Sequence, residues 1–457
     1  MTSRAALTLP LLRILFGLAV VLVVACALLS QSQSADSPSA EAPAVREAIL
    51  LYTADANGAV GPCGCAGGPS GGLSKLATAL RAYRQGPRPC LLVQAGDLTE
   101  GKRESKVCEI VGEAAARLSF DAVNLGPHET RQEPASLQKW LDDNKLPLVS
   151  ANLTLAAAGE TAPAAESPWK PWRIVERGGI RFGIVGVVAP RWFRADGNDL
   201  VCQEPLPAIE RALGELRGQA DVVVLLYGGD SNDARELARQ TPGLDVVVCG
   251  HTGRLLAEPV KEGRTLIVQP GANGDRLGAL AVRLDGEGRV VLSDHRIITL
   301  TGRVRMDPDI LKLGEPLEKA SGRRKRYETD KEPLRVETAA ACGKCHEKEY
   351  AAWQKTPHAR SMAALAEKHA DEPACGFCHA SGLLEEGGFV SVEKTADLAN
   401  VSCQACHPTD SSHGEKKEKP GGVHVEPGTC QQCHTAIDSP KFSFRSYYRK
   451  VVHTASP

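Results

Sequence analysis

The stretch Cys342-Gly343-Lys344-Cys345-His346 carries the pattern that decides how the last quarter of the chain folds. The pattern, Cys-x-x-Cys-His, recurs at Cys375, Cys403 and Cys430. In this pattern two thiols bond covalently to one haem, and the histidine reaches its iron. Zinc sites and disulfide frameworks also use paired cysteines, but they do not require a histidine directly after the second one. The four copies therefore predict four covalently bound haem c groups.

The residues that would hold these haems follow from the motifs. The predicted attachment sites are Cys342, Cys345, Cys375, Cys378, Cys403, Cys406, Cys430 and Cys433, and the predicted proximal iron ligands are His346, His379, His407 and His434. Five further histidines of the region are candidates for the distal side of the iron: His358, His413, His453, His424 and His369. Two histidine ligands on one iron favour electron transfer, whereas an open position favours binding of a small molecule.

Length, charge and cysteine count narrow the class of protein. A chain of 457 residues predicts two or three domains. The net charge of −1 lacks the basic excess of nucleic-acid-binding proteins, so we expect no nucleic-acid partner. Of the 15 cysteines, those outside the haem motifs are Cys26, Cys63, Cys65, Cys90, Cys108, Cys202 and Cys249.

The first 29 residues are typical of an export signal. Arg4 and Arg13 supply positive charge, and residues 14–29 form an apolar run that is short for a membrane span. The sequence Val23-Val24-Ala25-Cys26 resembles a lipoprotein processing box, which would attach lipid to Cys26 and tether the protein to a membrane. An ordinary signal peptide and an uncleaved anchor are the alternatives. All three place the body of the protein in the periplasm or another extracytoplasmic space.

The rest of the chain divides by composition. Residues 30–46 are rich in Ser, Ala and Pro and predict a flexible linker. Residues 47–301 show an α/β pattern, and 302–336 are a charged connector that includes the basic cluster 323–326. Residues 337–457 are predicted as a small, mostly helical and loop domain whose core the haems supply. Strands are predicted at 48–52, 90–93, 182–188, 222–226 and 246–249, and helices at 73–84 and 206–217.

Beyond its haem motifs, the last region contains three distinctive segments. They are Trp353-Gln354-Lys355-Thr356-Pro357-His358, Gly387-Gly388-Phe389-Val390-Ser391 and Lys450-Val451-Val452-His453. With them, the region resembles the tetrahaem cytochrome family of nitrifying bacteria, which accepts electrons from hydroxylamine oxidation. The resemblance implies electron transfer, though not the same donor. It also ranks His358, His413 and His453 as the best distal ligands, before His424 and then His369.

Polar segments at the ends of predicted strands mark the α/β region. They are Thr53-Ala54-Asp55-Ala56-Asn57-Gly58, Ala95-Gly96-Asp97, Asn124-Leu125-Gly126-Pro127-His128-Glu129 and Cys249-Gly250-His251-Thr252-Gly253. In order and spacing they resemble the metallophosphoesterase superfamily of the periplasmic 5′-nucleotidase and UDP-sugar hydrolase type. The resemblance implies a four-layer α/β sandwich. In active members, two metal ions at the strand ends activate a water against phosphorus.

The resemblance also implies which residues belong to the metal site. It matches Asp55, Asp97 and His251 to metal ligands, and His128 to the histidine that assists the leaving group. Three family ligands have been replaced, by Asn57, Pro127 and Gly253, and Tyr227-Gly228 stands where another histidine is expected. We therefore expect a degenerate site, with one divalent metal as the most that Asp55, Asn57, Asp97, His128 and His251 retain. The alternative is that Asp55 and Asp97 only cap loops.

A Gly-rich loop, Gly61-Pro62-Cys63-Gly64-Cys65-Ala66-Gly67-Gly68, follows the first predicted strand. It resembles a loop of exported nucleotidase-like proteins in which selenocysteine can replace one of these cysteines. The resemblance implies that Cys63 and Cys65 are redox thiols, and Cys249 would join them beside His251. The alternative is a structural disulfide with one of the remaining cysteines, Cys90, Cys108, Cys202 or Cys249.

Together these features predict an exported fusion that transfers electrons between redox partner proteins. Its phosphoesterase-fold domain would bind the substrate or partner through the thiol pair and the remnant metal site. Two alternatives stand beside this prediction. The first is a metal-dependent nucleotidase with an appended cytochrome, and the second is a non-catalytic scaffold that docks the cytochrome on a partner.

Overall fold

The computed structural model describes residues 46–62, 70–101, 105–156, 167–194, 199–301, 304–320, 335–365, 370, 372–407, 413, 425–431, 433–434, 439 and 441–453. The described residues belong to one compact unit. Cys26, the thiol pair Cys63 and Cys65, the basic cluster 323–326, His369 and His424 lie outside the described residues. In the described part of the chain, no helix combines the length and the hydropathy needed to cross a membrane.

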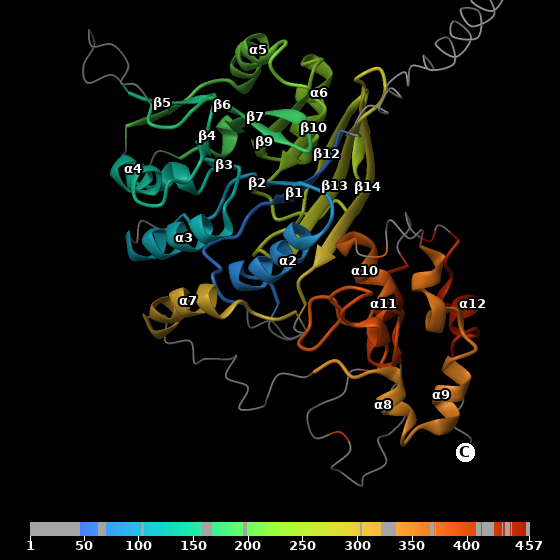
Figure 1. The fold of residues 1–457 in the computed structure, drawn as a ribbon. Helices are drawn as coiled ribbons and strands as arrows, with labels where there is room; N and C mark the ends of the chain where they lie inside the picture. Colours follow the sequence, from blue (N-terminus) through green and yellow to red (C-terminus); the bar gives the residue numbers. More distant parts are fainter. Residues whose placement is uncertain are drawn as a thin grey trace, which may run out of the picture. The chain divides into compact units, whose positions relative to one another are not determined.

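Two six-stranded sheets form the centre of the α/β region (Figure 1). The first contains β1 (Glu47–Thr53), β2 (Cys90–Gln94), β3 (Ala122–Asn124), β4 (Leu148–Val149), β13 (Arg276–Leu284) and β14 (Val290–Thr299). Its order is β14-β13-β1-β2-β3-β4. Strands β1 to β4 pair in parallel, and β13 and β14 pair antiparallel at one side. The sheet is therefore mixed.

The second sheet is also mixed. It contains β6 (Trp172–Arg177), β7 (Ile180–Val188), β9 (Val222–Gly228), β10 (Val246–Cys249), β11 (Val260–Glu262) and β12 (Thr265–Val268). Its order is β11-β12-β10-β9-β7-β6, with a parallel centre and antiparallel edge strands. A separate antiparallel pair is formed by β5 (Leu153–Leu155) and β8 (Leu200–Cys202).

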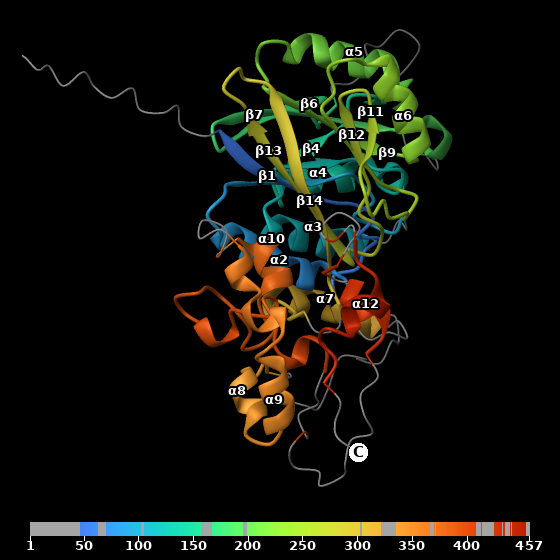
Figure 2. The same ribbon diagram turned by 90° about the vertical axis from the view of Figure 1, so that its right-hand side faces the viewer.

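Helices cover the outer faces of both sheets (Figure 2). The first sheet packs on α2 (Leu73–Gln85), α3 (Ser105–Leu118) and α4 (Pro134–Asp142), and the second packs on α5 (Pro205–Leu216) and α6 (Ser231–Gln240). A third apolar cluster lies between the two sheets. The order of layers is helix, sheet, sheet, helix, and the predicted four-layer sandwich is confirmed.

Strand β1 shows how the sequence produces this layering. Ile49 and Leu51 pack on the helix side of the first sheet, whereas Leu50 and Tyr52 pack between the two sheets. Successive side chains of a strand point to opposite faces, so a strand buried on both faces must be apolar throughout. The run Ala48-Ile49-Leu50-Leu51-Tyr52 meets this requirement, and all five residues are buried.

The haem region consists of short helices joined by loops. They are α8 (Ala339–Gly343), α9 (Glu347–Trp353), α10 (Pro373–His379), α11 (Pro427–Gln431) and α12 (Phe444–Tyr448). Single 3-10 turns lie at Pro357–Arg360, Met362–Ala364, Ala396–Leu398 and Cys403–Ala405. Among the described residues, the buried apolar cluster of this region is small: Val336, Ala380, Phe389, Leu398 and Ala399. So few apolar side chains make a weak core by themselves, which agrees with the expectation that the haems complete it.

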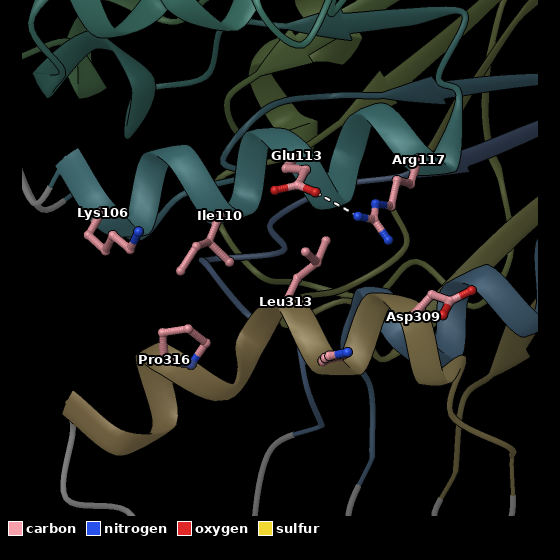
Figure 3. A pocket seen from close by; sticks show the side chains of 8 residues that line it. Lys106, Ile110, Glu113, Arg117, Asp309, Leu313 and Pro316 are labelled. Atoms are coloured by element: carbon pink, nitrogen blue, oxygen red, sulfur yellow. Dashed lines mark hydrogen bonds and ion pairs between the residues drawn. The ribbon is translucent and has the colours of Figure 1, made fainter.

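Helix α7 (Pro308–Ala320) belongs to the segment predicted as a connector. Its Ile310 is buried in the apolar cluster on the helix side of the first sheet. An open groove of about 450 Å³ separates α7 from α3, and Ile110 and Leu313 point into it (Figure 3). The ion pair between Arg117 and Glu113 lies along its wall. The groove is a packing gap between two amphipathic helices.

A tight contact between β1 and β13 yields a stability prediction. Gly278 lies opposite Tyr52, and a Cβ atom at Gly278 would lie 2.0 Å from Cζ of the Tyr52 ring. Tyr52 is fully buried, and its hydroxyl lies 2.6 Å from Nε2 of His295. We expect Gly278→Ala to lower the free energy of unfolding by about 1–3 kcal/mol, because the ring must move in a packed core.

Denaturant unfolding followed by circular dichroism measures this effect. The matched control is Gly286→Ala, where the added methyl group meets nothing within 4 Å. Equal stability of the two variants would show that the Tyr52 ring moves aside without cost.

Candidate functional sites

The loops after four parallel strands bring the predicted metal ligands together. Asp55 follows β1, Asp97 follows β2, His128 follows β3 and His251 follows β10. The carboxyl ends of parallel strands share one edge of a sheet, where α/β proteins place their sites. The buried side chain of Asn124 ties the sheets together at this edge, since its Nδ2 donates to the carbonyl oxygens of Ala95 and Val187, both at 3.1 Å.

The backbone at this edge is held in an unfavourable conformation. Asp55, Asn57, Asp97 and His251 have φ angles of 50°, 48°, 58° and 73°, in the left-handed region. Residues other than glycine rarely adopt this region and do so at a cost in free energy. Such strain persists where surrounding contacts impose it, and it is frequent at binding and catalytic sites.

Asp97, His128 and His251 form one cluster that could hold a metal ion. Each offers a ligand atom, and these atoms lie within 4.8 Å of one another. Nδ1 of His251 lies 2.7 Å from Oδ2 of Asp97, and Nδ1 of His128 lies 3.5 Å from the same oxygen. Two imidazole nitrogens and a carboxylate oxygen suit Zn²⁺ and similar divalent ions with open coordination positions.

Asp55 lies beside this cluster but is bound to the backbone. Its carboxylate accepts hydrogen bonds from the N–H groups of His251 at 2.5 Å and Gly253 at 2.9 Å. Burial, together with the negative charge of Asp97, raises the pKa of Asp55 to about 7. Asp55 therefore holds the His251 loop in place. A cation bound nearby would favour the ionised form of its carboxylate. The capping role that the sequence left open is thus observed for Asp55.

Asn57 is not part of the cluster of Asp97, His128 and His251. Its Nδ2 lies 3.5 Å from Oδ1 of Asn273, at the limit of a hydrogen bond. Its Oδ1 is buried and has no hydrogen-bond partner among the described residues. Pro127 and Gly253 offer no side-chain ligand, and Gly228 approaches Pro127 closely in place of a histidine. The remaining side chains therefore offer enough ligands for one metal ion but too few for a second.

Two neighbours of the cluster were missed in the sequence. Buried Glu129 accepts the N–H groups of Asp97 at 2.8 Å, Thr99 at 2.9 Å and Gly126 at 2.9 Å, and so fixes the Asp97 loop. Burial raises the pKa of Glu129 to about 8. The indole ring of Trp192 lies 4.9 Å from the imidazole of His251, between ring centroids. The sequence could have indicated Glu129, because it directly follows His128. Nothing in the sequence indicates that Trp192 lies near the cluster.

The described thiols of the α/β region are not among the residues of this cluster. Cys90, Cys108, Cys202 and Cys249 are all free. Cys249 is fully buried in the apolar cluster beneath α5 and α6, and burial raises its pKa strongly. A buried thiol in apolar surroundings is unreactive, which argues against a redox role of Cys249 beside His251. The proposed disulfides to these four thiols are also absent from the described residues.

The haem motifs have a common local structure. In three of them the histidine N–H donates to the carbonyl of the first cysteine, at 3.0 Å for His346 and 2.9 Å for His407 and His434. The remaining motif lies in α10. One helical turn thus brings both cysteines and the histidine close together, as attachment of one haem requires.

Three motif histidines face a second histidine. The ring centroids of His346 and His413 are 6.0 Å apart, those of His358 and His434 are 6.1 Å apart, and those of His407 and His453 are 5.6 Å apart. Two imidazoles on opposite sides of one iron, with bonds of about 2 Å, have centroids roughly 6 Å apart. The residues present therefore fit bis-histidine haems. His358, His413 and His453 are the three that the sequence ranked first.

The surroundings of these rings support ligation. Burial lowers the pKa of His358, His407 and His434, which favours the neutral imidazole that binds iron. Nδ1 of His434 lies 2.8 Å from Oγ of Ser439, and Nδ1 of His379 lies 2.8 Å from the carbonyl oxygen of Ser361. Such contacts orient a ligating histidine.

Comparisons with known proteins agree with both halves of this description. Residues 341–408 match the family model described as cytochrome c554 and c-prime. The 5′-nucleotidase of Rattus norvegicus is 30% identical over 265 residues, which cover 52% of this chain and 46% of the rat protein. The 5′-nucleotidase of Homo sapiens is 28% identical over 265 residues, with the same coverage of 52% and 46%. The chain thus spans about half the length of these relatives.

A solved structure shares the fold of the α/β region. The 5′-nucleotidase precursor from Thermus thermophilus matches with a TM-score of 0.54 and 23% identity, over 60% of this chain and 59% of that one. The chain therefore combines a 5′-nucleotidase-like metallophosphoesterase domain, which has an Asp/His cluster able to bind metal, with a C-terminal multihaem region of the cytochrome c554 type.

The raised pKa of Asp55 predicts a pH dependence of stability. Asp55 ionises near pH 7 when folded but near 3.8 as a free side chain. Between these values the folded protein binds the proton and the unfolded chain does not. We expect the unfolding free energy of metal-free protein to fall as pH rises from about 4 to 7, by up to about 1.4 kcal/mol per pH unit.

Chemical denaturation of EDTA-treated protein across this pH range measures the slope. Asp55→Asn should flatten it, whereas the exposed control Asp143→Asn should leave it unchanged. An unchanged slope in Asp55→Asn would assign the dependence to another group.

Proposed function

We propose that the protein is an exported electron-transfer protein whose C-terminal region carries four haem c groups. The observation that carries the proposal is the set of three opposed histidine pairs, each with a separation suited to one iron. Bis-histidine ligation leaves no coordination site for a substrate and changes little between the two iron oxidation states. The chain would thus pass electrons between partner proteins rather than transform a molecule at these haems.

Two sequence features support a place outside the cytoplasm. Residues 1–29 have the charge and apolar pattern of an export signal, and Cys26 follows a lipoprotein-like box. Covalent attachment of haem through Cys-x-x-Cys-His also takes place after export. We therefore propose a periplasmic or other extracytoplasmic location, with lipid at Cys26 as the tether. The donor and acceptor are redox proteins of the same compartment.

A second candidate function is metal-dependent hydrolysis of a phosphoester. The cluster of Asp97, His128 and His251 favours it, as does the similarity of the domain to 5′-nucleotidases. A divalent ion on these residues would polarise a phosphoryl oxygen or activate water. Asp97, His128 and His251 would hold it, each from the loop after a different strand. The replaced ligands Pro127 and Gly253 favour one ion over two and argue for weak hydrolysis.

The thiol pair Cys63 and Cys65 carries no part of this proposal, because both residues lie outside the described part of the chain. The proposed role of the phosphoesterase-like domain rests on its metal cluster and on its contacts with the haem region.

The paired histidines give a spectroscopic prediction. His358 faces His434, so His358→Ala should leave the haem of the last motif with one protein ligand. We expect electron paramagnetic resonance of the oxidised protein to show loss of one low-spin haem and gain of one high-spin haem. The number of haems should not change, because the attachment cysteines remain.

The control is His251→Ala, which removes a histidine outside the haem region. It should leave the spectrum unaltered. Retention of every low-spin signal in His358→Ala would contradict the proposed pair.

The metal cluster gives a separate prediction. Asp97 is the residue that both histidines approach, so Asp97→Asn should lower affinity for Zn²⁺ or Mn²⁺ by about 10- to 100-fold. Isothermal titration of full-length protein measures the affinity. The same proteins are assayed for hydrolysis of nucleotide monophosphates. If wild-type protein turns over above about 1 per second, a rate typical of enzymes, and Asp97→Asn does not, hydrolysis is the main function. If neither variant binds metal, the cluster is structural.

A further inference from the structure

The second haem motif lies against the phosphoesterase-like domain. Helix α10, which contains Cys375, Cys378 and His379, packs next to α2 (Figures 1 and 2). The approach is close: a Cβ atom on Gly86, at the end of α2, would lie 2.9 Å from Cδ of Pro373. Phe377 of α10 packs against the apolar cluster of the first sheet.

A largely buried ion pair crosses this contact. Nε of Arg88 lies 2.8 Å from Oε1 of Glu372, with side chains that are 15% and 4% exposed. Glu372 directly precedes α10, and its carbonyl accepts the N–H groups of Cys375 at 2.9 Å and Gly376 at 2.8 Å. The guanidinium of Arg88 also pairs with Glu47 of β1, at 2.8 Å. The haem motif is therefore fixed to the first strand of the other domain by charge as well as by packing.

Charged groups of the phosphoesterase-like domain act directly on the attachment cysteine. Burial raises the pKa of the Cys375 thiol, and the charges of Arg296, Glu372, Arg88 and Asp294 also act on this pKa. Three of these four residues precede the haem region. Solvent screens charges less when they are partly buried, so their fields extend to the group that Cys375 holds.

The corresponding cysteines of other motifs differ. Cys342 interacts with Glu337 and Cys403, and Cys403 interacts with Cys342 and Cys406, all within the haem region. In the second motif, charges of the α/β region thus reach the first attachment cysteine, which is not seen for Cys342 or Cys403.

We propose that the phosphoesterase-like domain sets the reduction potential of the second haem through Arg296 and Arg88, whose positive charges are opposed by the carboxylate of Glu372 at the start of α10. The proposal rests on haem attachment at Cys375 and Cys378. Reduction adds one electron to the haem, so a nearby positive charge stabilises the reduced form and a nearby negative charge destabilises it. Arg296 and Arg88 raise the potential, and Glu372 lowers it. The phosphoesterase-like domain thus forms part of the second haem site. This haem lies where the two halves of the chain meet.

Potentiometric titration of the full chain with its haems tests the proposal. In Arg296→Gln, one of four redox steps should move to lower potential, with a threefold to tenfold smaller ratio of reduced to oxidised haem at the original midpoint. A tenfold change corresponds to about 59 mV for a one-electron couple. Glu372→Gln should move the same step in the opposite direction. A loosened interface would instead move both variants the same way.

Two further variants control for structure. Arg296→Lys keeps the charge and should restore the wild-type potential. Arg289→Gln removes an arginine whose side chain is 69% exposed in the β13–β14 turn, and it should change nothing. The proposal is overturned if Arg296→Gln and Glu372→Gln shift in the same direction, if all four steps move together, or if none moves. The haem count of the wild-type chain tests the proposed function separately, because it does not depend on potential.

Discussion

The spacing of opposed imidazole rings is the constraint on which the haem region depends. Three pairs of imidazole rings lie near 6 Å apart, the separation that two rings on opposite sides of one iron require. The short helices and 3-10 turns of this region have few apolar side chains to pack together. On the proposed function, haem attachment and ligation complete this core, and a haem-free chain would lack the larger part of it.

The phosphoesterase-like domain obeys a different constraint. Two sheets buried on both faces form a rigid base, and the loops at their carboxyl ends hold Asp97, His128 and His251 together. Glu129 and Asp55 fix those loops by accepting backbone N–H groups. The same base presents Arg88 and Arg296 to the second haem motif. One domain thus has a cluster able to bind metal at one edge and contacts the second haem motif at another surface.

Much of the fold could be predicted because buried parallel strands leave continuous apolar runs. The runs at 48–52 and 222–226 correspond to β1 and β9, and the helix predicted at 73–84 corresponds to α2. Strand β14 was not predicted, since Ser293, Asp294 and His295 interrupt its apolar pattern. The proximity of Trp192 to His251 depends on tertiary packing and leaves no local signal. The partners of His346, His407 and His434 are likewise set by the fold, because each partner is far away in sequence.

The most direct test of this account is electron paramagnetic resonance of the oxidised full chain, together with its haem content. Opposed imidazoles on one iron produce low-spin haems. The account predicts four haems per chain, at least three of them low-spin with two histidine ligands. Fewer than three low-spin haems in a chain that carries all four would contradict the pairs and, with them, the assignment of the region to electron transfer.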